Sequence, residues 1–268
     1  MLRLACGLAA LVAAAATLFA AEVERKKVPV INEGGVVNAA GFMAAPDNFV
    51  APGSIIAIFG DDLALRTRAV SLADLDGGRL PTSLGGVWVI LGSQRIPLYY
   101  VSPTQINAQV PFELAPRAGD WSLIVSREGL ATAVAAQVKV VRAAPGLFPV
   151  ALHADYRVVG RGEIEGSEPL EPGELAILFG TGFGPVVPVS ETGELPPRAA
   201  GLVLPLDVWL ADERLPPESI LYAGQAPGFA GLCQVNVLLP NHGFAEDPEV
   251  RVEIDGLKSP TGFRLAIE

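Results

Sequence analysis

Cysteine is nearly absent from this 268-residue chain, which contains two. Cys6 lies within the first twenty residues, where we expect a cleaved leader, so Cys233 alone would remain after processing. An intrachain disulfide is thereby excluded, and stability must come from the apolar cores. We interpret Cys233 as a small buried apolar residue, because no neighbouring cation or histidine stands beside it to lower its pKa.

Histidine and positive charge are also scarce. His153 and His242 are the two histidines, and no motif indicates that they converge in a catalytic triad or a zinc site. We expect both at the surface or in turns, and we predict no catalytic residue and no cofactor. Asp and Glu outnumber Lys and Arg by 29 to 19, which gives a net charge of −10 and argues against a nucleic-acid partner.

No apolar run after residue 21 is long enough to cross a bilayer without a charge, a proline or a glycine. At the N-terminus, Arg3 precedes an uncharged run over residues 4–20 that ends in small residues, and a charged stretch follows. This pattern is typical of a signal peptide, which we place at 1–21, with a lead-in segment at 22–33. We therefore expect a secreted, periplasmic or cell-surface protein with no membrane span after cleavage. An uncleaved anchor is the alternative.

The chain repeats itself at a spacing of about 120 residues. A Pro-Gly pair, alternating apolar residues and a Phe-Gly pair make up both residues 51–60 and residues 171–180. Three further matches follow in the same order: 86–91 with 207–211, 105–111 with 234–240, and 121–126 with 249–254. Four matched segments in one order indicate one fold that is used twice.

Each repeated segment has the alternation of a β-strand, and most of the 23 prolines and 29 glycines lie between these runs. A helical period of apolar residues is absent after residue 21. The pattern predicts an all-β protein of two tandem immunoglobulin-like sandwich domains, the first over 34–144 and the second over 145–268. A barrel is the alternative. The linker near residues 142–148 is short, so we expect a limited range of interdomain angles.

Several of these motifs resemble one family. They are the segments 34–40, 50–53, 59–60, 81–86, 100–111, 221–224 and 227–231, with Gln234-Val-Asn236 after the last. Together they resemble the Solibacter-type C-terminal module of secreted acidobacterial proteins, over residues 34–268. The Pro-Gly element is also similar to the opening of IPT/TIG immunoglobulin-like domains. The resemblance implies an accessory module of exported proteins without an established activity.

Amide side chains alternate along two of the matched segments. They are Gln105, Asn107 and Gln109 in the first copy and Gln234 and Asn236 in the second. Alternation places them on one strand face, opposite apolar residues. We expect these amides either to satisfy backbone groups of adjacent loops or to form a polar face for a ligand.

Trp88 and Trp209 occupy matching positions, and each alternates with aliphatic residues. If the aliphatic residues point inward, both indole rings point outward or toward the other domain. We expect either a cover for a core edge or an aromatic platform for a sugar or a protein. The two tryptophans and the amides Gln105, Asn107, Gln234 and Asn236 are therefore the predicted binding residues.

Two loop features suggest ligands only weakly. Asp74 and Asp76 precede a glycine pair and are a weak Ca²⁺ candidate, but the EF-hand spacing is incomplete, so we predict no metal. The Gly-rich segment 180–185 follows a strand without meeting the dinucleotide or Walker spacing. We interpret it as a turn that requires positive φ angles.

These observations favour a non-enzymatic exported protein with a binding or structural role and a protein or polysaccharide partner. The loops 60–86 and 180–206 are the longest irregular stretches, and we expect contacts there. The alternative is an enzyme, or an accessory carbohydrate-binding subunit, acting on extracellular polymer. An enzyme would bring two carboxylates to about 5–10 Å in one cleft, one of them with a raised pKa.

Overall fold

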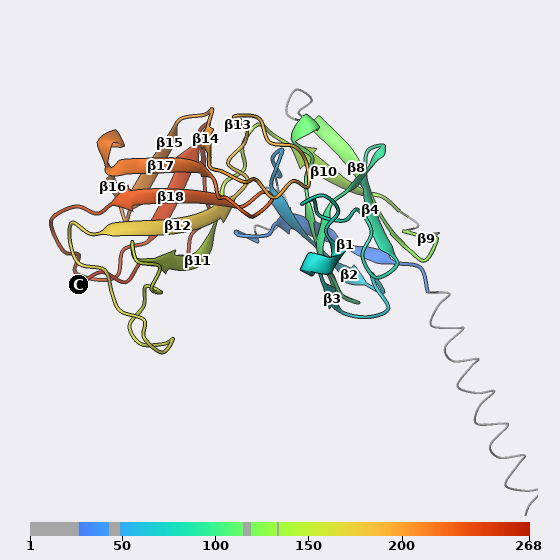
Figure 1. The fold of residues 1–268 in the computed structure, drawn as a ribbon, viewed down its shortest axis with the longest axis horizontal. Coiled ribbons are helices and arrows are strands. Elements are labelled where there is room, and N and C mark those ends of the chain that lie inside the picture. Colours follow the sequence, from blue (N-terminus) through green and yellow to red (C-terminus); the bar gives the residue numbers. More distant parts are fainter. Residues whose placement is uncertain (1–26, 43–48, 115–118, 133) are drawn as a thin grey trace, which may run out of the picture.

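The computed structural model describes residues 27–42, 49–114, 119–132 and 134–268. Over these ranges it contains β-strands and three short 3-10 helices, and no α-helix. Two β bodies lie side by side, one coloured blue to green and the other yellow to red (Figure 1). The predicted signal peptide and residues 22–26 of the lead-in lie outside the described residues. Within the described part, no helix has the length and apolar character needed to cross a membrane.

The first body consists of two antiparallel sheets. One has the strand order β1-β2-β7-β6-β3, and the other has the order β10-β8-β4-β5 with β9 beside β8. In that order, the strands of the first sheet are Val30–Asn38, Ile55–Asp61, Gln105–Gln109, Leu98–Val101 and Arg68–Ala69. Those of the second are Ala136–Val140, Gly119–Arg127, Val87–Leu91 and Gln94–Ile96, with β9 at Leu130–Ala131. The 3-10 helices η1 (Leu72–Asp74) and η2 (Phe112–Leu114) lie in the connections.

The second body repeats this plan. One sheet has the order β11-β12-β18-β17-β14-β13, and the other has the order β16-β15-β19-β20. In that order, the first sheet contains Gly146–Leu152, Leu175–Thr181, Cys233–Leu238, Ile220–Gln225, Ala200–Leu202 and Val186–Val187. The second contains Glu213–Arg214, Leu206–Leu210, Val250–Ile254 and Leu257–Lys258, and η3 lies at Pro217–Ser219.

Each body encloses one apolar core between its two sheets. In the first body, the alternate residues of β2 and β7 face those of β4 and β8, among them Ile58, Ile106, Val89 and Val125. In the second, the same layers are formed by residues such as Leu178, Val235, Val208 and Val252. Each strand therefore buries one face, as its period of two requires. The predicted all-β fold of two immunoglobulin-like sandwiches is confirmed.

The two sandwiches are joined by buried hydrogen bonds as well as by the chain. The Thr181 hydroxyl at the end of β12 accepts a hydrogen bond from the Ile55 amide at 2.8 Å. The Asn38 side chain at the end of β1 donates to the carbonyl of Ala144, in the linker, at 2.8 Å. We call this region the domain junction. Its polar groups are paired across the boundary, and a limited range of interdomain angles stays a prediction.

A loop of the second sandwich, residues 188–199, extends onto the first, and we call it the bracing loop. The amide of Gly193 donates to Gln109 Oε1 at 2.7 Å. The Leu80 amide donates to the carbonyl of Gly193 at 2.8 Å, and the Leu195 amide donates to the carbonyl of Gly78 at 3.0 Å. The loops 60–86 and 180–206, which we expected to provide contact regions, therefore contact each other through these residues.

Candidate functional site

The amide stripe lies on the outward face of both sandwiches. Gln105 and Asn107 are half-buried on β7, while Ile106 between them is fully buried in the core. Gln105 Nε2 donates to Asn107 Oδ1 at 2.9 Å. Gln234 and Asn236 on β18 form the same bond at 2.8 Å. The two copies thus hold their amide pairs in the same arrangement.

Aromatic side chains flank each amide pair on the neighbouring strands. Phe59 on β2 lies opposite Gln105, and Tyr100 on β6 lies opposite Asn107. In the second copy, β12 and β17 place the equivalent aromatic residues opposite the amides. We call each group of four residues an amide–aromatic face. The first is Phe59, Gln105, Asn107 and Tyr100, and the second is Phe179, Gln234, Asn236 and Tyr222.

Sequence reasoning found the amides of these faces and missed the aromatic residues, because the aromatic residues come from other strands. Phe59 and Phe179 do fall at equal places in the repeated Phe-Gly element, and Tyr100 and Tyr222 each precede a stripe. That recurrence is a signal that could have found them. Residues directly opposite each other in an antiparallel pair share a face, so strand pairing brings the four together.

The chemistry of each face is uncharged and amphipathic. Apolar ring surface lies beside amide groups that can both donate and accept hydrogen bonds. The Gln–Asn bond engages one donor and one acceptor of the two amides in each copy, and each amide group can make more than one hydrogen bond, so donors and acceptors remain for a ligand. Such a surface suits a neutral ligand that is rich in hydroxyl groups better than it suits an ion.

Gln109, the third amide of the first stripe, has a different role. It is fully buried, its Oε1 accepts from the Gly193 amide at 2.7 Å, and its Nε2 donates to the carbonyl of Gly53 at 3.4 Å. Leu238 occupies the equivalent place in the second copy and is 41% exposed. For Gln109 alone, the expectation that the amides satisfy backbone groups of adjacent loops is therefore confirmed.

Both predicted tryptophans face outward, and each is covered by a cation. Val87, Val89, Val208 and Leu210 point into the cores, which leaves Trp88 and Trp209 half-buried on the outer faces. The Arg95 guanidinium lies 4.6 Å from the centre of the Trp88 ring. The Lys258 ammonium lies 3.7 Å from the Trp209 ring. One surface of each indole is thus occupied by a cation–π contact and is not an open platform. A role for the two tryptophans in binding remains a prediction.

Asp74 and Asp76 in the acidic loop of the first copy bond to neighbouring residues of the same loop. Asp74 Oδ2 accepts hydrogen bonds from the hydroxyl and the amide of Ser71, and Oδ1 pairs with Arg68. The bonds from Ser71, together with Arg68, hold the pKa of the Asp74 carboxyl below its ordinary value. Asp76 pairs through its backbone with Arg79. Among the described residues, no group of three or more His, Cys, Asp or Glu side chains could hold a metal ion.

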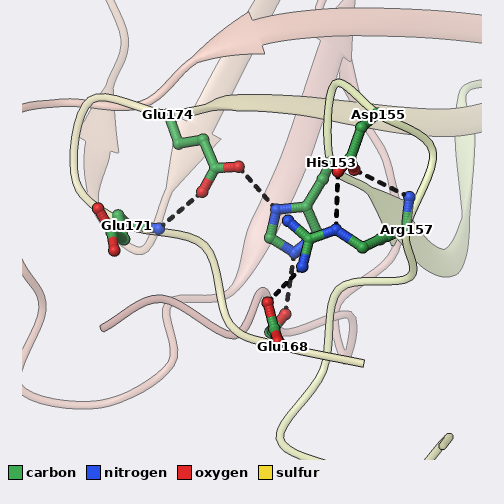
Figure 2. Close-up of polar contacts among 6 residues, drawn as sticks. All are labelled: His153, Asp155, Arg157, Glu168, Glu171 and Glu174. Atoms are coloured by element: carbon green, nitrogen blue, oxygen red, sulfur yellow. Dashed lines mark hydrogen bonds and ion pairs between the residues drawn. The ribbon is translucent and has the colours of Figure 1, made fainter. Parts of the chain in front are cut away.

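His153 directly follows β11, and its side chain is buried, with 3% exposed. Its Nδ1 lies 2.7 Å from Glu174 Oε1, and its Nε2 lies 3.1 Å from the carbonyl oxygen of Glu168 (Figure 2). Both neighbours are acceptors, so both ring nitrogens must carry protons to satisfy them. Burial acts to lower the pKa of His153, but the bonds to Glu174 and Glu168 outweigh it and raise the pKa. Of the two positions expected for His153, the surface or a turn, the structure shows the turn, in which the Tyr156 amide donates to the His153 carbonyl, while the side chain is buried.

A histidine against a carboxylate can be part of a catalytic dyad, but here both ring nitrogens already face acceptors, and neither is left to accept a proton from a nucleophile. Arg157 pairs with Asp155 and Glu168 beside it and closes the loop between β11 and β12 (Figure 2). Among the carboxyl groups of the described residues, those whose pKa is shifted are Asp74, Asp155, Glu174 and Asp247, and each shift is downward. A general acid requires the opposite direction.

Cys233 is buried at the start of β18, as expected. Burial raises the pKa of its thiol to about 12. At neutral pH the side chain is therefore an unreactive thiol that packs as an apolar group. The Gly-rich segment that follows β12 also matches expectation, because Gly182 and Gly184 have φ angles of 82° and 87°.

No family model matches the chain, and no curated protein matches it. Among solved structures, the SGBP-B of a mixed-linkage glucan utilization locus of Bacteroides ovatus, solved with a mixed-linkage heptasaccharide, is similar at 11% identity and a TM-score of 0.33. The similarity covers 86% of this chain and 46% of that one. The SGBP-B of a xyloglucan utilization locus of Bacteroides uniformis has 10% identity and a TM-score of 0.28, covering 90% of this chain and 50% of that one. The chain thus spans about half the length of these two proteins.

A tandem pair of immunoglobulin domains of titin is also similar, at 9% identity and a TM-score of 0.24. The similarity covers 90% of this chain and 97% of that chain. At such identities and TM-scores these similarities say nothing about the residues of a site.

Proposed function

We propose that this chain is a non-enzymatic exported binding protein whose amide–aromatic faces hold a neutral, hydroxyl-rich polymer of the polysaccharide class. One observation carries the proposal: both sandwiches present the same four side chains in the same strand register, on the face turned away from the core. Packing alone does not require a hydrogen-bonded Gln–Asn pair beside two aromatic rings at both places.

The chemistry of the faces supports a sugar polymer. Aromatic rings pack against the apolar faces of sugar rings, and amide groups bond to hydroxyl groups in either direction. None of the eight residues is charged, and the whole chain carries a net charge of −10. A neutral polymer is therefore favoured over a uronic-acid polymer, which the net charge of the chain would repel.

Export and family membership belong to the same proposal. The N-terminal pattern supports secretion to the periplasm, the cell surface or the exterior. The motifs over residues 34–268 support membership in the Solibacter-type module family, with IPT/TIG-like domains. A polysaccharide ligand agrees with an exported location, because such polymers lie outside the cytoplasm.

Binding to a panel of neutral and acidic soluble polysaccharides, measured by affinity electrophoresis, tests the proposal. The variant Asn107→Ala/Asn236→Ala removes one amide from each face, and we expect it to bind about tenfold more weakly, the loss that one hydrogen bond of about 1.4 kcal/mol produces. The control Gln137→Ala removes an exposed amide from β10 on the other sheet and should bind normally. Equal binding by all three proteins would contradict the proposal, as would release of reducing ends from the polymer.

A further inference from the structure

A cavity of about 310 Å³ lies where the two sandwiches meet, and we call it the junction pocket. Its apolar walls come from three parts of the chain: Phe49 between β1 and β2, Ala144 and Pro145 in the linker, and Leu257 and Pro260 around β20. Cavities of this size and apolar character at domain interfaces are the usual form of small-ligand sites. The pocket is separate from the amide–aromatic faces.

The walls of the junction pocket are fixed by close packing. Asn38, which also lines it, donates from Nδ2 to the carbonyl of Ala144 at 2.8 Å and accepts at Oδ1 from the amide of Ala40 at 2.8 Å. Its polar groups are thus committed to the backbone. Gly41 packs against the Pro260 ring so closely that an added Cβ would lie 2.6 Å from Pro260 Cγ. The pocket is therefore a preformed apolar cavity, with little hydrogen bonding to offer a sugar.

Two of the chain's lysines lie at this pocket. The whole sequence contains four lysines, at positions 26, 27, 139 and 258. Lys258 lines the pocket, and the Lys139 ammonium lies 5.2 Å from the ring centre of Phe49, which also lines it. Both lysines after residue 27 are therefore here, in a chain of net charge −10.

The Lys258 ammonium is held loosely enough to meet a ligand. It lies 3.7 Å from the Trp209 ring and 3.7 Å from Glu253 Oε2, and its side chain is 37% exposed. A single partly exposed ion pair of this length restrains a lysine only weakly. An anion at the pocket mouth can therefore share the ammonium with Glu253.

We propose that the junction pocket binds a small anionic amphiphile, an apolar molecule that bears one carboxylate, sulfonate or similar group. The apolar body packs against Phe49, Leu257 and Pro260, and the anion lies toward Lys258 and Lys139. A ligand held there touches both sandwiches and the linker, so its binding stabilises the junction itself.

Two probes that differ by one charge test this assignment. Anilinonaphthalene sulfonate has the proposed chemistry, and phenylnaphthylamine is its counterpart without the sulfonate. In fluorescence titrations of the folded protein we expect one saturable sulfonate site. We expect it to bind at least about fivefold more tightly than the neutral probe, a factor that corresponds to the contribution of one or two partly exposed cations.

The variant Lys258→Met keeps the aliphatic length of the side chain and removes the charge, and it should lose most of the preference for the sulfonate over the neutral probe, since Lys139 remains. The matched control is Arg95→Met, which removes the equivalent cation over Trp88 but lies away from the pocket. The control should bind both probes as the parent protein does. A thermal melt of each variant establishes that it is folded.

Absence of a saturable sulfonate site in the parent protein would overturn the proposal, and so would sulfonate binding that Lys258→Met leaves unchanged. An equal loss of sulfonate affinity in Lys258→Met and Arg95→Met would also overturn it, because the loss would then reflect the net charge of the protein and not a cation at the pocket. Polysaccharide binding is measured separately, so failure of the junction pocket and failure of the amide–aromatic faces give different results.

Discussion

The hydroxyl of Thr181 lies between the two sandwiches, where it accepts a hydrogen bond from the amide of Ile55 at 2.8 Å and donates one to the carbonyl of Gly231 at 2.7 Å. Thr181 is fully buried, so water is not available to replace either partner. One side chain at the end of β12 thereby ties the start of β2 and the loop before β18 into one interface.

Replacing Thr181 with valine tests the contribution of this hydroxyl. Thr181→Val keeps the shape and leaves the Ile55 amide without its acceptor, which costs about 1–3 kcal/mol of unfolding free energy. Urea denaturation measures the loss. Thr181→Ser retains the hydroxyl and should recover most of the stability. If valine and serine were equally stable, packing and not the hydrogen bonds would account for the role of Thr181.

Gly182 follows Thr181 and has no space for a side chain. Its φ angle is 82°, and an added Cβ would lie 2.1 Å from the carbonyl oxygen of Ala144. Gly182→Ala should therefore lose more than the roughly 1 kcal/mol that a left-handed alanine costs. The control is Gly228→Ala, because Gly228 has a φ angle of 80° and nothing within 4 Å of an added Cβ. Melting temperatures of the two variants should differ by several degrees, and similar values would count against a tight junction.

Gln109 holds the bracing loop, and leucine, the residue of the second copy, is the natural replacement. Gln109→Leu leaves the buried Gly193 amide without its side-chain acceptor. We expect the loop to open more often and trypsin to cleave after the exposed Arg198 about tenfold faster in the folded protein. Gln137→Leu, on the exposed side of β10, is the control for added apolar surface. Unchanged cleavage in Gln109→Leu would show that the backbone bonds alone secure the loop.

His153 makes stability depend on pH. Its pKa is raised in the folded protein, so its contribution is complete below the unfolded value of about 6.5 and declines as pH rises through the higher folded value. Burial acts to raise the pKa of Glu174, but the hydrogen bond from His153 outweighs it and lowers the pKa, so the pair is also lost in acid, below the ordinary range of that carboxyl.

The variant His153→Gln isolates this contribution. Hydrogen bonds to charged groups contribute about 1.5–3 kcal/mol. The unfolding free energy of the parent protein should therefore be about 2 kcal/mol higher than that of His153→Gln near pH 6, and the difference should be clearly smaller near pH 9. Urea denaturation at both pH values gives the difference. His242→Gln is the control, because His242 pairs with Glu213 at the surface and should have little effect. A gap that widened toward pH 9 would contradict the charged state inferred for His153.

Cys233 should resist modification in the folded protein. With its pKa raised to about 12 by burial, the thiolate is too rare to react with a disulfide reagent at pH 8. We expect no colour with Ellman's reagent until denaturant is added, and then one thiol per chain that has lost its leader. Rapid reaction of the folded protein would mean that the start of β18 opens to solvent.

Much of the fold could be predicted because the information is local. Val250, Val252 and Ile254 alternate with Arg251 and Glu253, and such a period of two fixes a half-buried strand without knowledge of its partners. The internal repeat then predicted a second sandwich, because segments with the same apolar pattern in the same order bury the corresponding strand faces. The outward position of the tryptophans followed from the same rule.

The junction could not be predicted, because its contacts join residues far apart in the sequence. Alternation gives Gln105, Asn107 and Gln109 the same face, yet only Gln109 meets the bracing loop, 84 residues later in the chain. His153 was expected at the surface or in a turn, and it is buried where Glu174, just before β12, bonds to its ring. For both Gln109 and His153, the position of the side chain depends on a residue distant in sequence, which the local pattern does not identify.

The bracing loop also sets an order of events during synthesis. All residues of the first sandwich are synthesised before Thr181 and Gly193. Until then, the Ile55 amide and the Gln109 side chain form hydrogen bonds with water, because their protein partners do not yet exist. Domains generally fold as they emerge, the N-terminal one first. The bracing loop therefore packs onto a first sandwich that is already folded. The relative orientation of the two sandwiches is fixed only after the second half of the chain has been synthesised.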